Sequence, residues 1–566
     1  MTKKLFVAIF TLLDCLTANY AKADGVAWAD SIDTQAEVST SVSTNKDFRP
    51  LWSYSNKWGV YSQYEQGELT VHATAKLRLL HSRNASVGVG LGLVGSTDSD
   101  RRMLHEAYVD ARFFMIDFLA GMKCYSPLAS DDDVTSGNYL MSSTARPLPR
   151  LGVGIFDYWS VPLTRNWIQI KGGLFVGKML DTDFDSEYAK QFSTDVVLHE
   201  KFVYGRIGGW HVKPYLGLTH SVQMGGTLPD GTDIPMDFWA SFWGKGSEKF
   251  RNVENGRFRG EATNAAGAHQ GLWDMGLDFD VQEVSGHLYF HRMFTDFDGH
   301  KPFGKKNKDH YLGLTLRTPI RWMKKINIEQ VMTYDQNGEG TPDPIGTDSY
   351  GNFMVIFPGD VPDDEKPFQQ WMSEHFLPEV VSEWEEASGK KLTSEYKYQF
   401  LRYTWGNGQY AGRKTYLNNG LYYQGCTQDG LSYGTPLFHS AETMKRYMTE
   451  GTSAQMLGFL ANTRISAVNI GIVGEPTEKI RYRVRYTFSK NHGSLFDKYD
   501  GGSYSMVLYE NYFYETSKIE HYLQIGGSYE LRPDIRLMAE FCSDFGELYN
   551  ASSIRLGARY CFTKKR

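Results

Sequence analysis

Residues 136–158 have the sequence SGNYLMSSTARPLPRLGVGIFDY, in which a polar loop runs directly into a strand. Pro147 and Pro149 fix the backbone φ angle and remove two amide donors, so the end of the loop is stiff and cannot pair in a sheet. From Leu151 onward, branched apolar residues alternate with glycine or Phe156. Successive strand side chains point to opposite faces, so one face is apolar and the other is nearly bare. This pattern predicts a barrel-wall strand that carries a recognition loop at its rim.

Strict alternation of apolar and polar residues recurs along the chain. Leu, Val and Ala alternate with Thr, His, Lys and Arg at 69–80, and apolar residues alternate with three arginines at 480–488. The same period marks further stretches at 85–93, 116–122, 523–531 and 554–562. The predicted strands run to about ten residues, the length that crosses a bilayer when tilted. Their polar faces carry full charges, which a water-filled barrel lumen tolerates and a small packed core does not.

The connections between these strands alternate in length. Short connections are predicted at 81–84, 161–165, 208–212, 282–286, 475–479 and 532–534. Long connections are predicted at 124–150, 177–197, 224–270, 293–309, 336–463 and 489–518. Outer-membrane barrels have short periplasmic turns and long outer loops. The sequence therefore predicts an all-β fold, a transmembrane antiparallel β-barrel of roughly 18 strands counted from Trp52, with long outer loops and a small helical insertion.

The N-terminus predicts export. Lys3 and Lys4 precede a short apolar stretch, and Ala21-Lys22-Ala23 offers a small-residue cleavage site, so we expect a signal peptide at 1–23. A lead-in segment follows at 24–50, either periplasmic or, through its Ala36/Val38 alternation, sealing the barrel seam. The barrel is assigned to 51–566.

An insertion at 336–412 interrupts the largest outer loop. Within it, residues 367–388 place apolar side chains at helical spacing among many glutamates, with Pro378 breaking the pattern. An acidic face is repelled by an anionic membrane surface, so we expect this segment to pack as a lid over the barrel mouth.

Composition excludes several classes of protein. The formal net charge is −6, whereas a nucleic-acid binder carries a basic excess. The five cysteines form no CxxC pair or zinc spacing, so no metal or cofactor is predicted. Cys542 and Cys561 fall on adjacent predicted strands, where either a disulfide or two free thiols would fit. No nucleophile, base and orienting acid form a recognisable catalytic set, so we do not expect an enzyme.

Several ordered motifs resemble the capsule assembly Wzi family. They are the opening stretch, LHEKFVYGRIGG at 198–209, GLTHSVQMGGT at 217–227, YDQNG at 334–338, YLNNGLYYQG at 416–425, GTPLF at 434–438, NTRISAVNIGI at 462–472 and YRVRYTFSKNHG at 482–493. The resemblance implies an outer-membrane barrel that holds surface polysaccharide and acts as a lectin. A periplasmic helical bundle found in that family has no counterpart here, and the insertion at 367–388 is unusual for it.

The candidate glycan-binding residues are charged, amide or aromatic residues in outer loops or on the lumenal face. They are Arg146, Arg150, Trp239, Trp243, Lys245, Tyr416, Asn418, Asn419, Tyr422, Arg481, Arg483 and Arg485. Guanidinium groups bind carboxylates of acidic polysaccharides, amides pair with hydroxyls, and aromatic rings stack on the apolar faces of sugars.

Each candidate has a structural alternative. Arg146 and Arg150 could pair with the aspartates at 131–133, and the arginines at 481–485 with Glu530 and Glu540. The Asn-Gly pair within 416–422 also fits a tight turn, and the tryptophans fit an aromatic girdle.

The leading hypothesis is an outer-membrane anchor for capsular or exopolysaccharide. The second is a passive diffusion porin for small solutes, and the third is a barrel-embedded hydrolase. We expect contact with surface polysaccharide and outer-membrane lipid but not nucleic acid, a monomeric state, and the capsule-export machinery as a further candidate partner.

Overall fold

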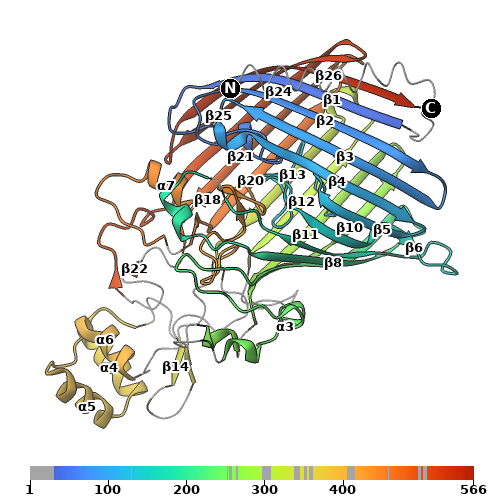
Figure 1. The fold of residues 1–566 in the computed structure, drawn as a ribbon. Coiled ribbons are helices and arrows are strands. Elements are labelled where there is room, and N and C mark those ends of the chain that lie inside the picture. The colour runs from blue at the N-terminus through green and yellow to red at the C-terminus, as the bar shows by residue number, and fades with distance from the viewer. Residues whose placement is uncertain are drawn as a thin grey trace.

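The computed structural model describes residues 31–565 except 129, 183, 252, 254–257, 263–264, 296–307, 337–344, 348, 350–352, 356–360, 405–414, 457, 495–498 and 501–506. Eighteen antiparallel strands form one closed barrel (Figure 1). Each strand pairs with its neighbours in chain order, and the first strand also pairs with the last. The predicted fold is confirmed; seventeen of the eighteen strands follow Trp52, where the predicted count of roughly 18 began, and one precedes it.

The wall strands run from 7 to 15 residues in length. They are β1(Ser31–Ser43), β2(Gly67–His81), β3(Ala85–Ser96), β4(Met103–Phe113), β5(Ile116–Met122), β6(Arg150–Ser160), β7(Ile168–Lys178), β8(Val197–Ile207), β9(Val212–Met224), β10(Ala268–Val281), β11(Val284–Thr295), β12(His310–Arg317), β13(Lys325–Met332), β20(Ile465–Gly474), β21(Ile480–Asn491), β24(Lys518–Arg532), β25(Ile535–Gly546) and β26(Ala551–Lys565).

The two faces of the wall differ as the alternation predicts. Leu91, Val109 and Leu151 are exposed on the outside, where a bilayer would cover them. His72 and Thr74, from the opposite phase of β2, line a cavity inside the barrel. Apolar residues facing outward and polar residues facing the lumen are the arrangement of a membrane barrel.

Glycines in the wall make room for lumenal aromatic rings. A Cβ on Gly90 would lie 2.3 Å from the ring of Tyr108 on the next strand, and a Cβ on Gly152 would lie 2.3 Å from the ring of Phe175. Both rings are buried. The bare glycine face of the stretch at 151–156 is therefore covered by side chains of a neighbouring strand.

β1 closes the barrel and lies inside the segment assigned as lead-in. It pairs with β26 from Ser31 to Ser43 and with β2 from Ser31 to Val42. The structure thus adopts the alternative in which the Ala36/Val38 alternation seals the seam, and the wall begins at Ser31 rather than after residue 50. The segment that begins at Leu51 forms no wall strand at first. Instead, α2(Leu51–Tyr54) lies buried within the loop that joins β1 to β2.

The long connections lie at one end of the barrel and the short turns at the other (Figure 1). By the usual orientation of such barrels the long ones are the outer loops. They carry α3(Phe238–Trp243) and α7(Ala441–Tyr447), and short strands β14(Ile345–Thr347), β15(Phe353–Val355), β16(Thr427–Gln428), β17(Leu431–Ser432), β18(His439–Ser440), β19(Leu460–Asn462), β22(Tyr499–Asp500) and β23(Val507–Leu508). The largest core cluster joins loop residues such as Tyr139, Tyr416 and Leu437 to lumenal side chains of the wall.

The insertion forms three helices, α4(Glu365–His375), α5(Pro378–Ser388) and α6(Lys397–Thr404). Pro378 is the first residue of α5, where its missing amide leaves no hydrogen bond unmade, so it separates α4 from α5. Phe368, Trp384 and Phe400 pack on one another in a separate cluster. Figure 1 shows the three helices beyond the other loops and apart from the wall, rather than as a lid on the mouth.

None of the described helices combines the length and apolar character that a membrane-crossing helix requires. Cys124, Cys426, Cys542 and Cys561 are all free thiols, so Cys542 and Cys561 do not pair. The predicted signal peptide and parts of the insertion lie outside the described residues.

Candidate functional site

An outer loop, residues 123–149, crosses the lumen and is called the plug loop below. It leaves the wall after the seven-residue β5 and returns at β6, yet it contacts β20 and β21, nine strands away around the eighteen-stranded wall. Asn469 on β20 donates a 2.9 Å hydrogen bond to the carbonyl of Val134. A Cβ on Gly471 would lie 2.1 Å from that carbonyl, so only glycine allows this approach. The plug loop therefore spans the full width of the barrel.

Aspartates of the plug loop meet basic residues on the far wall. Asp131 pairs with Lys325 at 2.8 Å and with Arg317 at 3.3 Å. Asp133 pairs with Arg481, and at 3.5 Å with Arg483. Burial alone would raise the pKa of Asp133, but Arg481, Arg483 and Lys325 hold it below its ordinary value. Asp131 and Asp133 thus pair with basic residues of β12, β13 and β21, and not with Arg146 and Arg150.

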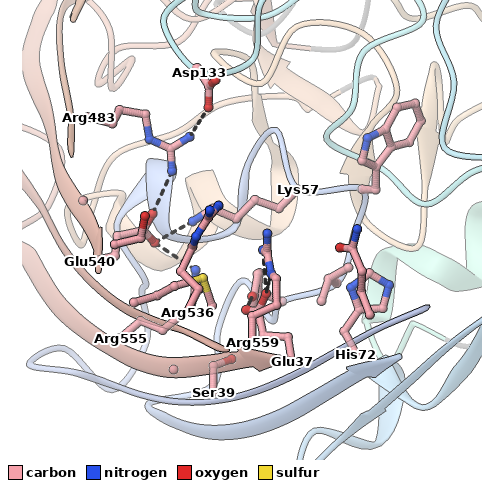
Figure 2. A pocket seen from close by; sticks show the side chains of 18 of the residues that line it. Glu37, Ser39, Lys57, His72, Asp133, Arg483, Arg536, Glu540, Arg555 and Arg559 are labelled. Atoms are coloured by element: carbon pink, nitrogen blue, oxygen red, sulfur yellow. Dashed lines mark hydrogen bonds and ion pairs between the residues drawn. The ribbon is translucent and has the colours of Figure 1, made fainter. Parts of the chain in front are cut away.

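Beneath the plug loop lies a cavity of about 470 Å³. Figure 2 shows Lys57, Arg483 and Arg555 converging on Glu540, at 2.6, 3.2 and 2.8 Å. Beside them Arg559 pairs with Glu37 at 2.7 Å. Seven lysines and arginines line the cavity against four carboxylates, namely Lys57, Lys76, Arg481, Arg483, Arg536, Arg555 and Arg559 against Glu37, Glu106, Asp133 and Glu540.

The loop residue Lys57 links this cavity to the loop between β1 and β2. Its ammonium also donates to the carbonyls of Trp52 and Ser53, at 2.9 and 3.0 Å. Burial lowers the pKa of Lys57 to about 8, and Arg555 acts in the same direction while Glu540 opposes it. The cavity is therefore cationic overall, but its central charges are already paired within the protein.

The predicted arginines are held in such pairs. Arg483 contacts Glu540, as the structural alternative expected, whereas Glu530 pairs with Arg536 instead. Arg485 is buried, stacks over Trp52 at 4.4 Å and donates to the carbonyl of Asp132.

Arg146 and Arg150 have partners that the sequence did not indicate. Arg146 pairs at 2.5 Å with Asp429, a residue of the largest outer loop. Arg150, at the start of β6, pairs at 3.0 Å with Glu200 of β8. Both arginines are largely buried, and Arg146 joins two outer loops while Arg150 joins β6 to β8.

The segment 416–422 is also internal. Tyr416 and Tyr422 are buried, and their hydroxyls donate to Asp309 at 2.9 Å and to the Gly225 carbonyl at 3.1 Å. Asn418 is buried. Its side-chain NH2 donates to the Leu460 carbonyl, and its Oδ1 accepts from the Leu460 amide. The half-buried Asn419 caps a turn by accepting from the Leu421 amide at 2.8 Å. This is the tight turn that the alternative interpretation expected.

The tryptophans of the loop between β9 and β10 are different. Trp239 and Trp243, on α3, are 66% and 63% exposed, and Lys245 beside them is exposed. Asp237 caps the helix by accepting from the Ala240 amide, and Gly244 ends it with a left-handed φ of 63°. Phe242 packs 4.9 Å from Trp243, and Lys201 of β8 lies 3.7 Å above the Phe242 ring. We call Trp239, Trp243 and Lys245 the aromatic platform.

Sequence reasoning missed Lys57, Glu37, Asp429 and Glu200 as members of these sites. Arg555 and Arg559 carried a signal, because both lie on the polar phase of β26 and so had to face the lumen. Glu37 also lies between Ala36 and Val38, on the opposite phase of that alternation. Lys57 and Asp429 gave no signal, since they lie in loops whose partners are distant in sequence.

No family model matches the sequence, and no curated protein matches it. Many solved structures match this chain, and three of them follow. Wzi of Escherichia coli, an outer membrane protein involved in group 1 capsule assembly and a carbohydrate-binding β-barrel, is 11% identical with a TM-score of 0.45, over 96% of this chain and 87% of that one. OccD3 (OpdP) of Pseudomonas aeruginosa is 9% identical with a TM-score of 0.41, over 94% and 91%. OprD of the same organism is 8% identical with a TM-score of 0.38, over 96% and 98%.

Proposed function

We propose that this outer-membrane β-barrel binds polysaccharide at the cell surface and anchors it there without catalysing a reaction. The observation that carries the proposal is the aromatic platform. Trp239 and Trp243 are exposed on an outer-loop helix, where the ring of Phe242 lies 5.8 and 4.9 Å from their rings. Indole faces stack on the apolar faces of sugar rings, and the exposed ammonium of Lys245 suits the carboxylates of an acidic polysaccharide.

The filled lumen favours a binding role over passive diffusion. The plug loop crosses the barrel, and Tyr139, Leu417 and Tyr433 pack with wall residues in one buried cluster. The guanidinium groups that would attract anionic solutes are ion-paired inside it. A porin of this size would instead keep a water-filled channel.

The direct test is binding of purified protein to the capsular polysaccharide of its own host. The double variant Trp239→Ala/Trp243→Ala should weaken binding about tenfold or more, because each lost stacking contact contributes about 0.5–1.5 kcal/mol. Trp322→Ala is the matched control, since Trp322 is equally exposed at 66% but lies at the end with short turns. Equal loss in both variants, or full binding by the double variant, would contradict the proposal.

A cellular test addresses anchoring separately. Deleting the gene should leave polysaccharide synthesis intact and shift polymer from the cell pellet to the medium. If the polymer stays on the cells, binding occurs without anchoring and that part of the proposal fails.

A further inference from the structure

A β-bulge turns two successive residues of β4 toward the lumen. Gly92 pairs with Glu106, but the next residue, Leu93, pairs with Leu104, so His105 is an extra residue on β4. Side chains in a regular strand alternate between faces, whereas two residues oppose one at a bulge. His105 and Glu106 accordingly both line the lumenal cavity and are only 1% and 3% exposed.

Cys124 adds a thiol to this pair. It lies at the start of the plug loop, and its amide donates a 2.9 Å hydrogen bond to Glu106 Oε1. Its Sγ lies 4.0 Å from His105 Nδ1, and the imidazole, carboxylate and thiol atoms all lie within 4.8 Å of one another. A tetrahedral zinc ion with bonds of about 2.0–2.3 Å separates its ligands by roughly 3.3–3.8 Å. Small side-chain rotations are enough to close that gap.

The imidazole is already oriented for this role. His105 Nε2 lies 2.7 Å from the carbonyl of Trp58, an acceptor that requires Nε2 to carry the proton. The lone pair is then on Nδ1, the nitrogen that faces Cys124. A carbonyl that fixes the tautomer and the ring angle in this way is the usual partner of a metal-binding histidine.

A second imidazole stands beside the cluster. The ring of His72 lies 5.0 Å from that of His105, edge to face, and its Nε2 is buried without a hydrogen-bond partner among the described residues. Figure 2 shows His72 across the cavity from Glu540 and beside the ion pair of Arg559 with Glu37. A buried unpaired ring nitrogen is costly unless a ligand satisfies it.

We propose that His105, Glu106 and Cys124 bind a zinc ion, with its fourth position open to the lumenal cavity. One imidazole nitrogen, one carboxylate oxygen and one thiolate sulfur are a ligand set typical of Zn²⁺, and three protein ligands with one open position are a common arrangement. The ion would join the first turn of the plug loop to β4. The zinc site does not depend on the proposed glycan-binding function.

The test uses the full chain in detergent under reducing conditions. After chelation, gel filtration and incubation with Zn²⁺, we expect one zinc per protein by elemental analysis. Cys124→Ser, His105→Asn and Glu106→Gln should each weaken zinc affinity at least about tenfold. Cys561→Ser is the control, since Cys561 is also a free, half-buried thiol but lies on β26.

Cobalt provides a second readout, which reports whether a thiolate is among the metal ligands. The Co²⁺-loaded protein should show thiolate-to-metal charge-transfer absorption, which Cys124→Ser abolishes and Cys561→Ser retains. The heat-modified gel shift of each variant reports whether the barrel has folded. Absence of retained zinc in folded wild type, or unchanged absorption in folded Cys124→Ser, would overturn the proposal.

Discussion

At the scale of single residues, buried carboxylates organise the charges of the lumen. Glu540 alone contacts Lys57, Arg483 and Arg555, which come from a loop and two different strands. Its side chain is 12% exposed, so water screens these contacts poorly. A buried cation that loses its partner keeps its desolvation cost, which makes such a hub sensitive to substitution.

We predict that Glu540→Gln lowers the free energy of unfolding by about 3–5 kcal/mol, the usual cost of breaking a buried ion pair. Urea unfolding followed by tryptophan fluorescence measures it. Glu530→Gln is the control, because Glu530 pairs only with the more exposed Arg536 among the described ion pairs, and its effect should be below about 1 kcal/mol. Similar losses in the two variants would show that Glu540 is not the hub.

The buried carboxyl of Asp309 should make the stability of the outer loops depend on pH. Burial raises its pKa from 3.8 to about 7, against hydrogen bonds from the amides of Asp335 and Gln336. The folded state therefore holds this proton more tightly than the unfolded chain does, so the contribution to stability is present below pH 3.8 and is lost as pH rises through about 7.

Hydrogen exchange of residues 333–336 and 416–418, corrected for intrinsic rates, should report easier opening above pH 7 than under acid conditions. Asp309→Asn should remove this dependence, whereas Asp233→Asn, an exposed carboxylate in another loop, should keep it. A pH-dependent opening that survives in Asp309→Asn would rule out this group as its source.

At the scale of elements, β1 and the α4–α6 insertion have opposite roles. β1 pairs along its whole length with β26 and almost as far with β2, so it removes the two open edges that an incomplete barrel would present. The helices α4, α5 and α6 bury their large side chains on one another.

Deletion of residues 31–43 should therefore prevent barrel closure, whereas deletion of 362–404 should leave it intact. Refolding into detergent followed by gel electrophoresis with and without heating distinguishes the outcomes, because folded barrels migrate faster when unheated. A heat-sensitive fast band from the variant without β1 would contradict this assignment.

At the scale of the whole molecule, the outer loops fill the barrel. The plug loop reaches the wall nine strands from its origin, and it is tied there by Asp131, Asp133 and Val134. Core packing continues from it into the largest outer loop through Tyr139, whose ring lies 5.6 Å from that of Tyr416. Packing inside the lumen thus involves several loops together.

The wild-type protein should show little steady conductance in a planar bilayer. Replacing residues 127–146 by a short Gly-Ser linker should raise the conductance, because it removes the segment that spans the lumen. The control is a variant that lacks residues 362–404 instead, and its conductance should equal that of the wild type. Large, steady currents from the wild type would favour the diffusion porin.

The sequence by itself determined the barrel, its approximate strand number and the end that carries the long loops. Period-two alternation and turn chemistry are local properties, so they survive without knowledge of contacts. The sequence also placed Arg481, Arg483 and Arg485 in the lumen and separated α4 from α5 at Pro378.

Tertiary structure alone decided which partners these residues meet. Asp133 and Arg483 lie 350 residues apart in the chain, and Arg146 meets Asp429 across two loops. Tertiary structure also decided which loop aromatics are exposed. Tyr416 and Tyr422 are buried, whereas Trp239 and Trp243 are exposed, although all four are aromatic residues of outer loops. It also decided the positions of His105 and Glu106, which a regular strand would send to opposite faces. A one-residue shift in pairing with β3 brings them together, because register depends on the neighbouring strand and not on the local pattern.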